Sequence, residues 1–196
     1  MLSIMPAAGQ PAERQLFSEE WRDGWIPSDF SRPGEVVFTD TAVVLHAGDP
    51  MTGITWTGDH PRINYEIAFE AQRVDGRDFF CGLTFPVGDS PCTLILGGWG
   101  GTVVGLSSVD GLDASENETR TSMEFEAGQW YRILLRVTDR EITAYVDDEL
   151  VVALETEGRR FSVRPEVSRS RPLGIATWRT TGALRDLRIR SLEPTP

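Results

Sequence analysis

The sequence predicts an all-β protein, a two-sheet antiparallel β-sandwich, from three observations. Apolar residues alternate with polar ones at a period of two, turn-forming residues fill nearly every gap between these runs, and no stretch carries apolar residues at helical spacing. Short strands without helices have to cover one another face to face, as they do in a sandwich or a barrel.

The clearest strand covers residues 63–72, where Ile63, Ile67 and Phe69 belong to an alternating apolar face. Residues 129–154 predict a three-stranded meander, because two Asp-containing reversals separate three alternating runs. The other candidate strands, in chain order, are residues 36–39, 42–46, 53–57, 79–85, 93–96, 103–107, 122–125, 174–180 and 184–191.

Length and composition predict one domain. The chain has 196 residues, of which 40% are hydrophobic, enough for a substantial core without a metal or disulfide. No linker or internal repeat interrupts it. We expect a single β-sandwich domain over residues 16–192, with loose termini at 1–15 and 193–196.

The charge restricts the partners. The net charge is −11, and all 19 basic residues are Arg. Such a chain repels phosphate backbones, so we expect no nucleic-acid partner. No apolar run approaches the roughly 20 residues of a membrane span, so we expect no membrane insertion. Oligomeric state leaves no signal in the sequence.

The first ten residues lack the basic and apolar regions of a secretory signal. We therefore expect a cytoplasmic protein by default, and a periplasmic or extracellular one if a leader has been removed. A hairpin around residues 87–90 places Cys81 opposite Leu96 and Cys92 opposite Phe85. The two cysteines are therefore four residues out of register, which separates them by about 13 Å along the strands. A disulfide needs Cα atoms within roughly 7 Å, so we expect two free thiols.

The Gly-Gly-Trp-Gly-Gly run at residues 97–101 is the most unusual stretch. Glycines on both sides leave the Trp99 indole bare, and an exposed indole is a platform on which a sugar ring can stack. The alternative is a glycine-rich bend with Trp99 as part of the core.

Residues 110–118 carry four acids. If the segment after Ala114 is extended, Glu116 and Glu118 share one face at a spacing compatible with a pair of glycosidase carboxylates. Asp110, Asp113 and Glu116 are also suitable ligands for a divalent cation such as Ca²⁺. The third alternative is a solvated acidic loop whose own Ser, Asn and Thr side chains cap it.

Several further side chains are candidates for a saccharide site, each with a structural alternative. His60 follows Trp56 in a polar turn, Arg77 and Asp78 precede an apolar strand, and Trp178 with Arg179 combines an aromatic ring with a cation. The catalytic candidates are Glu116, Glu118, Asp78, His60 and Arg179, and the substrate-binding candidates are Trp99, Trp178, Trp56 and Arg77.

Several segments resemble one family when taken together. They are residues 16–17 (Leu-Phe), 24–25 (Gly-Trp), 76–86 (Gly-Arg-Asp-Phe-Phe-Cys-Gly-Leu-Thr-Phe-Pro), 97–101, 105–108 (Gly-Leu-Ser-Ser), 110–119 and 130–132 (Trp-Tyr-Arg). This pattern resembles the 3-keto-disaccharide hydrolase domain family. The resemblance implies a concanavalin A-like jelly roll with a saccharide-facing side, and action on glycosides oxidised at C3. The Glu-x-Asp-x-x-Glu strand of laminarinase-type relatives is absent, so no catalytic residue transfers from them.

Three hypotheses follow. The first is an enzyme that cleaves a 3-keto-glycoside, with Glu116 or Glu118 as base, Arg179 or a divalent cation as electrophile, and Asp78 or His60 as a secondary acid. The second is a non-catalytic carbohydrate-binding module that uses the same Trp residues. The third is an interaction domain without a small ligand.

Overall fold

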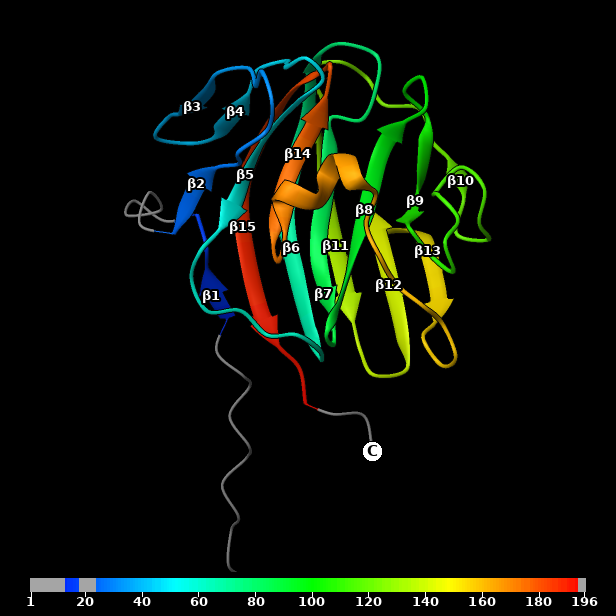
Figure 1. Ribbon diagram of the computed structural model, residues 1–196. Helices are drawn as coiled ribbons and strands as arrows, with labels where there is room; N and C mark the ends of the chain where they lie inside the picture. Colours follow the sequence, from blue (N-terminus) through cyan, green and yellow to red (C-terminus); the bar gives the residue numbers. More distant parts are fainter. Residues whose placement is uncertain (1–12, 18–23, 194–196) are drawn as a thin grey trace, which may run out of the picture.

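Two antiparallel sheets form the structure, which is a computed structural model describing residues 13–17 and 24–193 (Figure 1). The eight-stranded sheet has the order β13 (Glu149–Glu155), β12 (Glu141–Val146), β11 (Trp130–Val137), β6 (Tyr65–Asp75), β15 (Thr181–Ser191), β4 (Val43–Leu45) and β3 (Val36–Phe38), and β1 (Glu13–Gln15) also pairs with β15. The seven-stranded sheet has the order β10 (Thr121–Ser122), β9 (Val103–Ser107), β8 (Ser90–Gly98), β7 (Cys81–Val87), β14 (Gly174–Trp178), β5 (Met51–Trp56) and β2 (Trp25–Pro27). The predicted all-β sandwich is confirmed.

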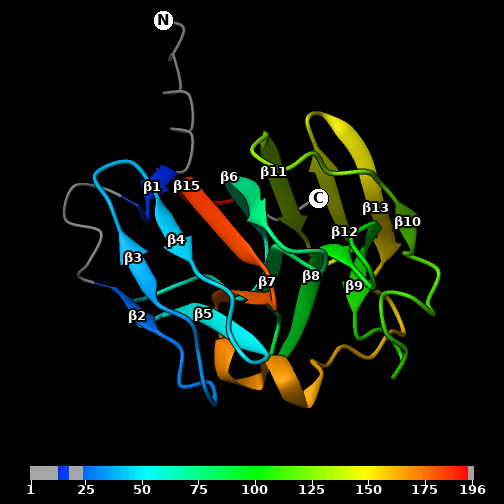
Figure 2. The same cartoon turned by 90° about the horizontal axis from the view of Figure 1, so that it is seen from above.

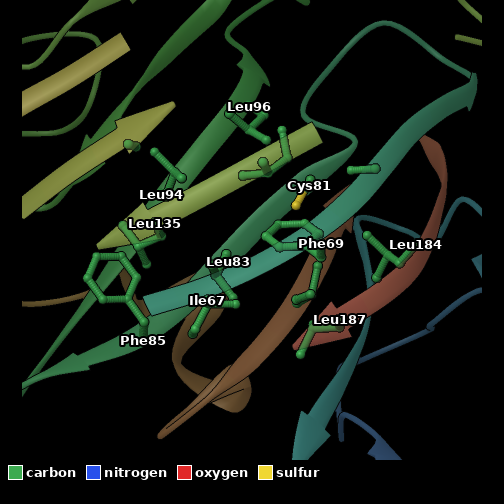
Figure 3. Packing of buried hydrophobic residues seen from close by; sticks show 14 of the residues in the cluster. Ile67, Phe69, Cys81, Leu83, Phe85, Leu94, Leu96, Leu135, Leu184 and Leu187 are labelled. Carbon is green, nitrogen blue, oxygen red and sulfur yellow. The ribbon is translucent and has the colours of Figure 1, made fainter. Parts of the chain in front are cut away.

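The core lies between the sheets and consists of alternate residues of their strands. Ile67 and Phe69 of β6 face Leu83 and Phe85 of β7, and Leu94 of β8 joins them (Figure 3). All five are at most 3% exposed. Burying each such side chain stabilises the fold by about 1.5–3 kcal/mol, which explains why the period-two pattern identified these strands.

A second apolar cluster covers the outer face of the seven-stranded sheet. The 3₁₀ helix η2 (Pro165–Ser170) lies there, on the side away from the eight-stranded sheet (Figure 2). Its Val167 packs in a cluster with Phe79, Ile95 and Ala176, which project outward from the sheet region. η2 therefore covers part of the outer face of this sheet, which the sequence pattern did not predict.

The predicted meander is confirmed as β11, β12 and β13. Residues 13–15, expected to be loose, instead form β1 against β15, while the expected loose ends at 1–12 and 194–196 lie outside the described residues. Within the described part of the chain, no helix is long and apolar enough to cross a lipid bilayer.

The cysteine register is as predicted. Cys81 pairs with Leu96 and Cys92 with Phe85, and both thiols are free and buried. Burial raises the pKa of the Cys81 thiol, and it raises the pKa of the Cys92 thiol to about 12.

Candidate functional site

A cavity of about 200 Å³ opens on the outer face of the seven-stranded sheet, beside η2. Because alternate residues of a strand point to opposite faces, Thr93 and Ile95 of β8 point outward while Cys92 and Leu94 point into the core. The cavity is lined by Asp78, Phe79, Thr93, Ile95, Trp99, Ser107, Arg164, Glu166, Val167 and Trp178.

Trp99 stands at the tip of the β8–β9 hairpin. The Gly101 N–H donates to the Gly98 carbonyl at 3.2 Å. Trp99 and Gly100 between them have φ values of 47° and 91°, the positive values that a type I′ turn requires. The indole is 41% exposed and lines the cavity. The alternative in which Trp99 is part of the core is therefore wrong, and its role as a platform for a sugar ring stays a prediction.

Trp178 supplies a second aromatic wall. It ends β14, is half-buried, and packs against Phe79 with ring centroids 6.3 Å apart. Phe79 also lines the cavity. Large amphipathic rings of this kind give apolar contact with little loss of conformational entropy on binding.

Asp78 precedes Phe79 at the cavity wall and is half-buried. Its Oδ1 accepts a hydrogen bond from the Phe79 N–H at 2.8 Å, and its own N–H donates to Thr180 Oγ1 at 3.0 Å. Among the described residues, no Arg or His lies within ion-pair distance of this carboxylate.

Arg164 is the cation of the cavity. Its Nη2 lies 3.0 Å from Glu166 Oε1, and Nη1 pairs with the Asp113 carboxylate. Hydrogen bonding to Glu166 raises the pKa of Arg164, and the same hydrogen bond lowers the pKa of Glu166. The guanidinium is thus permanently charged, and two carboxylates from different segments fix its orientation.

The floor of the cavity is hydroxyl-rich. Thr93 Oγ1 lies 3.0 Å from Thr84 Oγ1, and Ser107 Oγ donates to Asp113 Oδ1 at 3.4 Å. Thr93 and Ser107 line the cavity. Hydroxyls, a carboxylate and a guanidinium beside aromatic rings can hydrogen-bond sugar hydroxyls while the rings contact a sugar face.

The structure does not bring Glu116 and Glu118 into this cavity. The expected extended geometry after Ala114 is wrong, because the Glu116 and Asn117 N–H groups both donate to the Asp113 carbonyl in a succession of turns. Glu116 and Glu118 are exposed, and Glu118 pairs with Arg159.

Residues 110–118 form an acidic loop that is capped by its own polar side chains, which was the third alternative. Asn117 Nδ2 donates to the carbonyls of Leu106, Leu112 and Asp113 at 2.7, 3.1 and 2.8 Å. Thr119 donates its backbone N–H to Asn117 Oδ1 at 2.9 Å. The stretch is therefore a structural loop built around a half-buried amide.

The proposed cation ligands are not grouped as a metal site. Asp110 Oδ2 lies 2.9 Å from Arg159 Nη1, and Asp110 Oδ1 accepts from the Arg160 N–H at 2.9 Å. These hydrogen bonds, that of the Arg160 N–H first, lower the pKa of Asp110. Asp113 pairs with Arg164 instead, and Glu116 stays exposed. In residues 13–17 and 24–193, no three His, Cys, Asp or Glu side chains are placed to hold a metal ion.

The remaining candidates lie outside the cavity. His60 lines a different cavity together with Arg62, Arg169 and Arg171. The exposed Arg179 lies 3.8 Å from Asp49.

Trp56 and Arg77, predicted to bind substrate, do not line the cavity either. Trp56 Nε1 donates to the Asp59 carbonyl at 3.2 Å, and its ring packs on Trp25 with centroids 5.4 Å apart. Trp56 is thus a packing residue. The exposed Arg77 is not among the cavity-lining residues, although its neighbour Asp78 is.

Arg164 and Glu166 line the cavity but were not among the residues predicted from the sequence. Both belong to the region between β13 and β14, which has no apolar period and gave no signal of its own. An Arg-x-Glu spacing that forms a local ion pair was the only available hint, and such pairs are common on surfaces.

A comparison of this chain with models of known protein families identifies its family. A family model described as a 3-keto-alpha-glucoside-1,2-lyase-like domain matches residues 16–190. The chain belongs to this family. The resemblance to the 3-keto-disaccharide hydrolase domain family is thereby confirmed, and the family is one of carbohydrate-active domains.

Several solved structures share the fold of this chain at low sequence identity. A Bacillus subtilis protein of unknown function with a galectin-like fold has a TM-score of 0.65 at 10% identity, covering 97% of this chain and 100% of that one. The carbohydrate-binding module CBM66 from Bacillus subtilis has a TM-score of 0.58 at 13% identity, with 86% and 96% coverage.

A third solved structure similar to this chain is domain 4 of an extracellular arabinanase from Geobacillus stearothermophilus, in complex with arabinotriose. Its TM-score is 0.55 at 14% identity, covering 88% of this chain and 84% of that one. The search of curated proteins found no match to this chain.

Proposed function

We propose that the cavity beside η2 binds a sugar ring oxidised at C3 and that the protein cleaves the glycosidic bond of this 3-keto-glycoside by elimination. Asp78 is the base. The proposal depends on which carboxylate of the cavity is free of an ion pair. Of the two described carboxylates that line the cavity, Glu166 is paired with Arg164, whereas Asp78 has no basic partner. Membership of the lyase-like family supports the reaction class.

The chemistry needs one base, one cation and one acid. A ketone at C3 acidifies the C2–H, so the Asp78 carboxylate takes that proton and the electron pair passes to the C3 oxygen as an enolate. When the ketone re-forms, the C1–C2 double bond forms and the C1–O bond breaks. The departing oxygen takes a proton from the Asp78 carboxylic acid. Addition of water to the double bond would complete a net hydrolysis.

Arg164 is suited to the enolate. Two carboxylates orient its guanidinium before substrate arrives, and a preoriented cation stabilises developing negative charge without reorganising. Arg164 takes the role that the sequence analysis assigned to Arg179. Trp99 and Trp178 serve as the stacking walls.

A second function, saccharide binding without turnover, is favoured by one observation. The cavity of about 200 Å³ is below the roughly 300–1,000 Å³ typical of small-molecule sites. Such a site could hold the end of a saccharide as a binding module does.

Asp78→Asn separates the two functions. The substrates are a 3-oxidised disaccharide and its unoxidised counterpart; the readouts are calorimetric affinity and the ultraviolet absorbance of the conjugated enone product. We expect the variant to lose turnover by about 10²- to 10⁴-fold and to keep its affinity within a few fold. Glu118→Gln, an exposed acid outside the cavity, is the matched control and should retain turnover.

Each outcome has one meaning. Undiminished turnover in Asp78→Asn would show that Asp78 is not the base. Binding without turnover in the wild-type protein would favour the binding-module function, and neither binding nor turnover would leave an interaction domain.

A further inference from the structure

Arg73 is a charged residue at a core-facing position of the sandwich. In β6 the inward residues are Tyr65, Ile67, Phe69 and Ala71, and Arg73 is next in this alternation. Its backbone is fixed, since the Gly128 N–H donates to the Arg73 carbonyl at 2.8 Å. The side chain therefore leaves the eight-stranded sheet toward the other sheet.

The contacts of Arg73 lead to the hairpin that carries Trp99. Nη2 donates to the Gly101 carbonyl at 2.7 Å, and the guanidinium carbon lies 5.5 Å from the centroid of the Phe80 ring. Among the described residues, no carboxylate pairs with Arg73, and its buried Nε has no hydrogen-bond partner. A half-buried cation without an acid is costly, so charge pairing does not explain why Arg stands here.

Two glycines of the hairpin give the guanidinium its space. A Cβ at Gly97 would lie 2.8 Å from Arg73 Nη2, and a Cβ at Gly101 would lie 3.3 Å from Nη1. The Gly101 Cβ would also lie 3.2 Å from the Arg77 carbonyl, in the segment that leads to Asp78. By contrast, a Cβ at Gly100 would meet nothing within 4 Å.

We propose that Arg73 is a positioning residue that holds the hairpin of residues 97–101, so that the Trp99 indole stands over the cavity. Gly97 and Gly101, whose φ values of 76° and 110° already favour glycine, also leave the space that this guanidinium occupies. Arg73 acts through the hairpin and does not touch the sugar. Its effect on saccharide affinity rests on the proposed function, whereas its effect on Trp99 does not.

The first test replaces the arginine. Arg73→Met keeps much of the side-chain length and removes the donors, and Arg132→Met, an exposed arginine of β11, is the control. Acrylamide quenching of Trp99 is obtained by subtracting the same variant carrying Trp99→Phe. We expect greater quenching in Arg73→Met and roughly a 10- to 100-fold rise in KM or Kd for the 3-oxidised disaccharide, with kcat changed far less.

The second test leaves Arg73 in place and covers the case in which Arg73→Met does not fold. Gly97→Ala and Gly100→Ala both add a methyl group at positive φ, at 76° and 91°. The methyl group at Gly97 would crowd Arg73 and would also meet the Gly101 carbonyl and the Phe80 ring at 3.2 Å, whereas the methyl group at Gly100 would meet nothing within 4 Å. We expect Gly97→Ala to alter Trp99 quenching more than Gly100→Ala does. We also expect this difference to shrink when Arg73→Ala is present in both variants.

Unchanged Trp99 quenching in folded Arg73→Met would overturn the proposal, as would equal effects of Gly97→Ala and Gly100→Ala. If the wild-type protein bound no saccharide, the proposed function would fail, and the quenching comparison alone would still decide whether Arg73 positions Trp99.

Discussion

At the scale of single residues, arginine pairing determines which acids of the site region are available. Arg159 holds Asp110 and Glu118, while Arg164 holds Asp113. The partners are 41 to 51 residues apart in the chain. The sequence shows that residues 110–118 are acidic, but not that tertiary ion pairs hold Asp110, Asp113 and Glu118. It also does not show that Glu116 is exposed outside the cavity, so Glu116 and Glu118 were preferred to Asp78 as the base.

A buried acid gives a prediction about pH. Glu66 of β6 lies between Arg136 and Arg190 in register and is 6% exposed. Burial acts to raise the pKa of Glu66, but the hydrogen bonds from Arg136 and Arg190 outweigh it and lower the pKa from 4.5. A lowered pKa means stabilisation that is present above the unfolded value and lost as pH falls through the folded value.

We therefore expect Glu66→Gln to lower the free energy of unfolding by about 1–2 kcal/mol at pH 7, after allowing for solvent screening at the partly exposed arginines. The difference from wild type should shrink as pH falls below about 4.5. Urea denaturation at pH 7, 5 and 3.5 measures it. Asp89→Asn, which removes an exposed ion pair, should cost little, and an equal loss in the two variants would contradict the role of Glu66.

At the scale of elements, the period-two pattern predicted the strands that bury one face. Residues 103–107 were predicted with the boundaries of β9, and the meander matched β11 to β13. The pattern could not predict η2, which has six residues and no apolar period. Glu166 and Val167 of η2 form one wall of the cavity. This wall could not be predicted without η2.

Val167 should hold η2 on the sheet. It is 5% exposed and lines the cavity. We expect Val167→Ala to cost about 1–2 kcal/mol and to speed hydrogen exchange of the η2 amides more than that of β7 and β8. Leu150→Ala, at a position that is 52% exposed, is the control. Unchanged exchange in η2 would show that Val167 does not hold the helix.

At the scale of the whole molecule, the two sheets seal both cysteines in the core, as strand register predicted. Burial raises the pKa of both thiols, to about 12 for Cys92. The thiolate is the reactive form, so we expect neither to react with a thiol reagent at pH 8 in the native protein. Both should react once denaturant unfolds it.

An engineered exposed thiol serves as the control for this measurement. Asp89→Cys, at a side chain that is 94% exposed, should label at once under the same native conditions. Rapid labelling of Cys81 or Cys92 without denaturant would mean that the sandwich opens locally.

The strand order has a consequence for biosynthesis. β15, formed by residues 181–191, lies between β6 and β4, and it also pairs with β1 (Figure 1). A nascent chain lacking these residues has β6 on one side of a gap and β4 on the other, with no hydrogen-bonded neighbour joining them. The eight-stranded sheet can therefore close only when residues 181–191 are present, and a chain truncated after Thr180 should give a divided, aggregation-prone product.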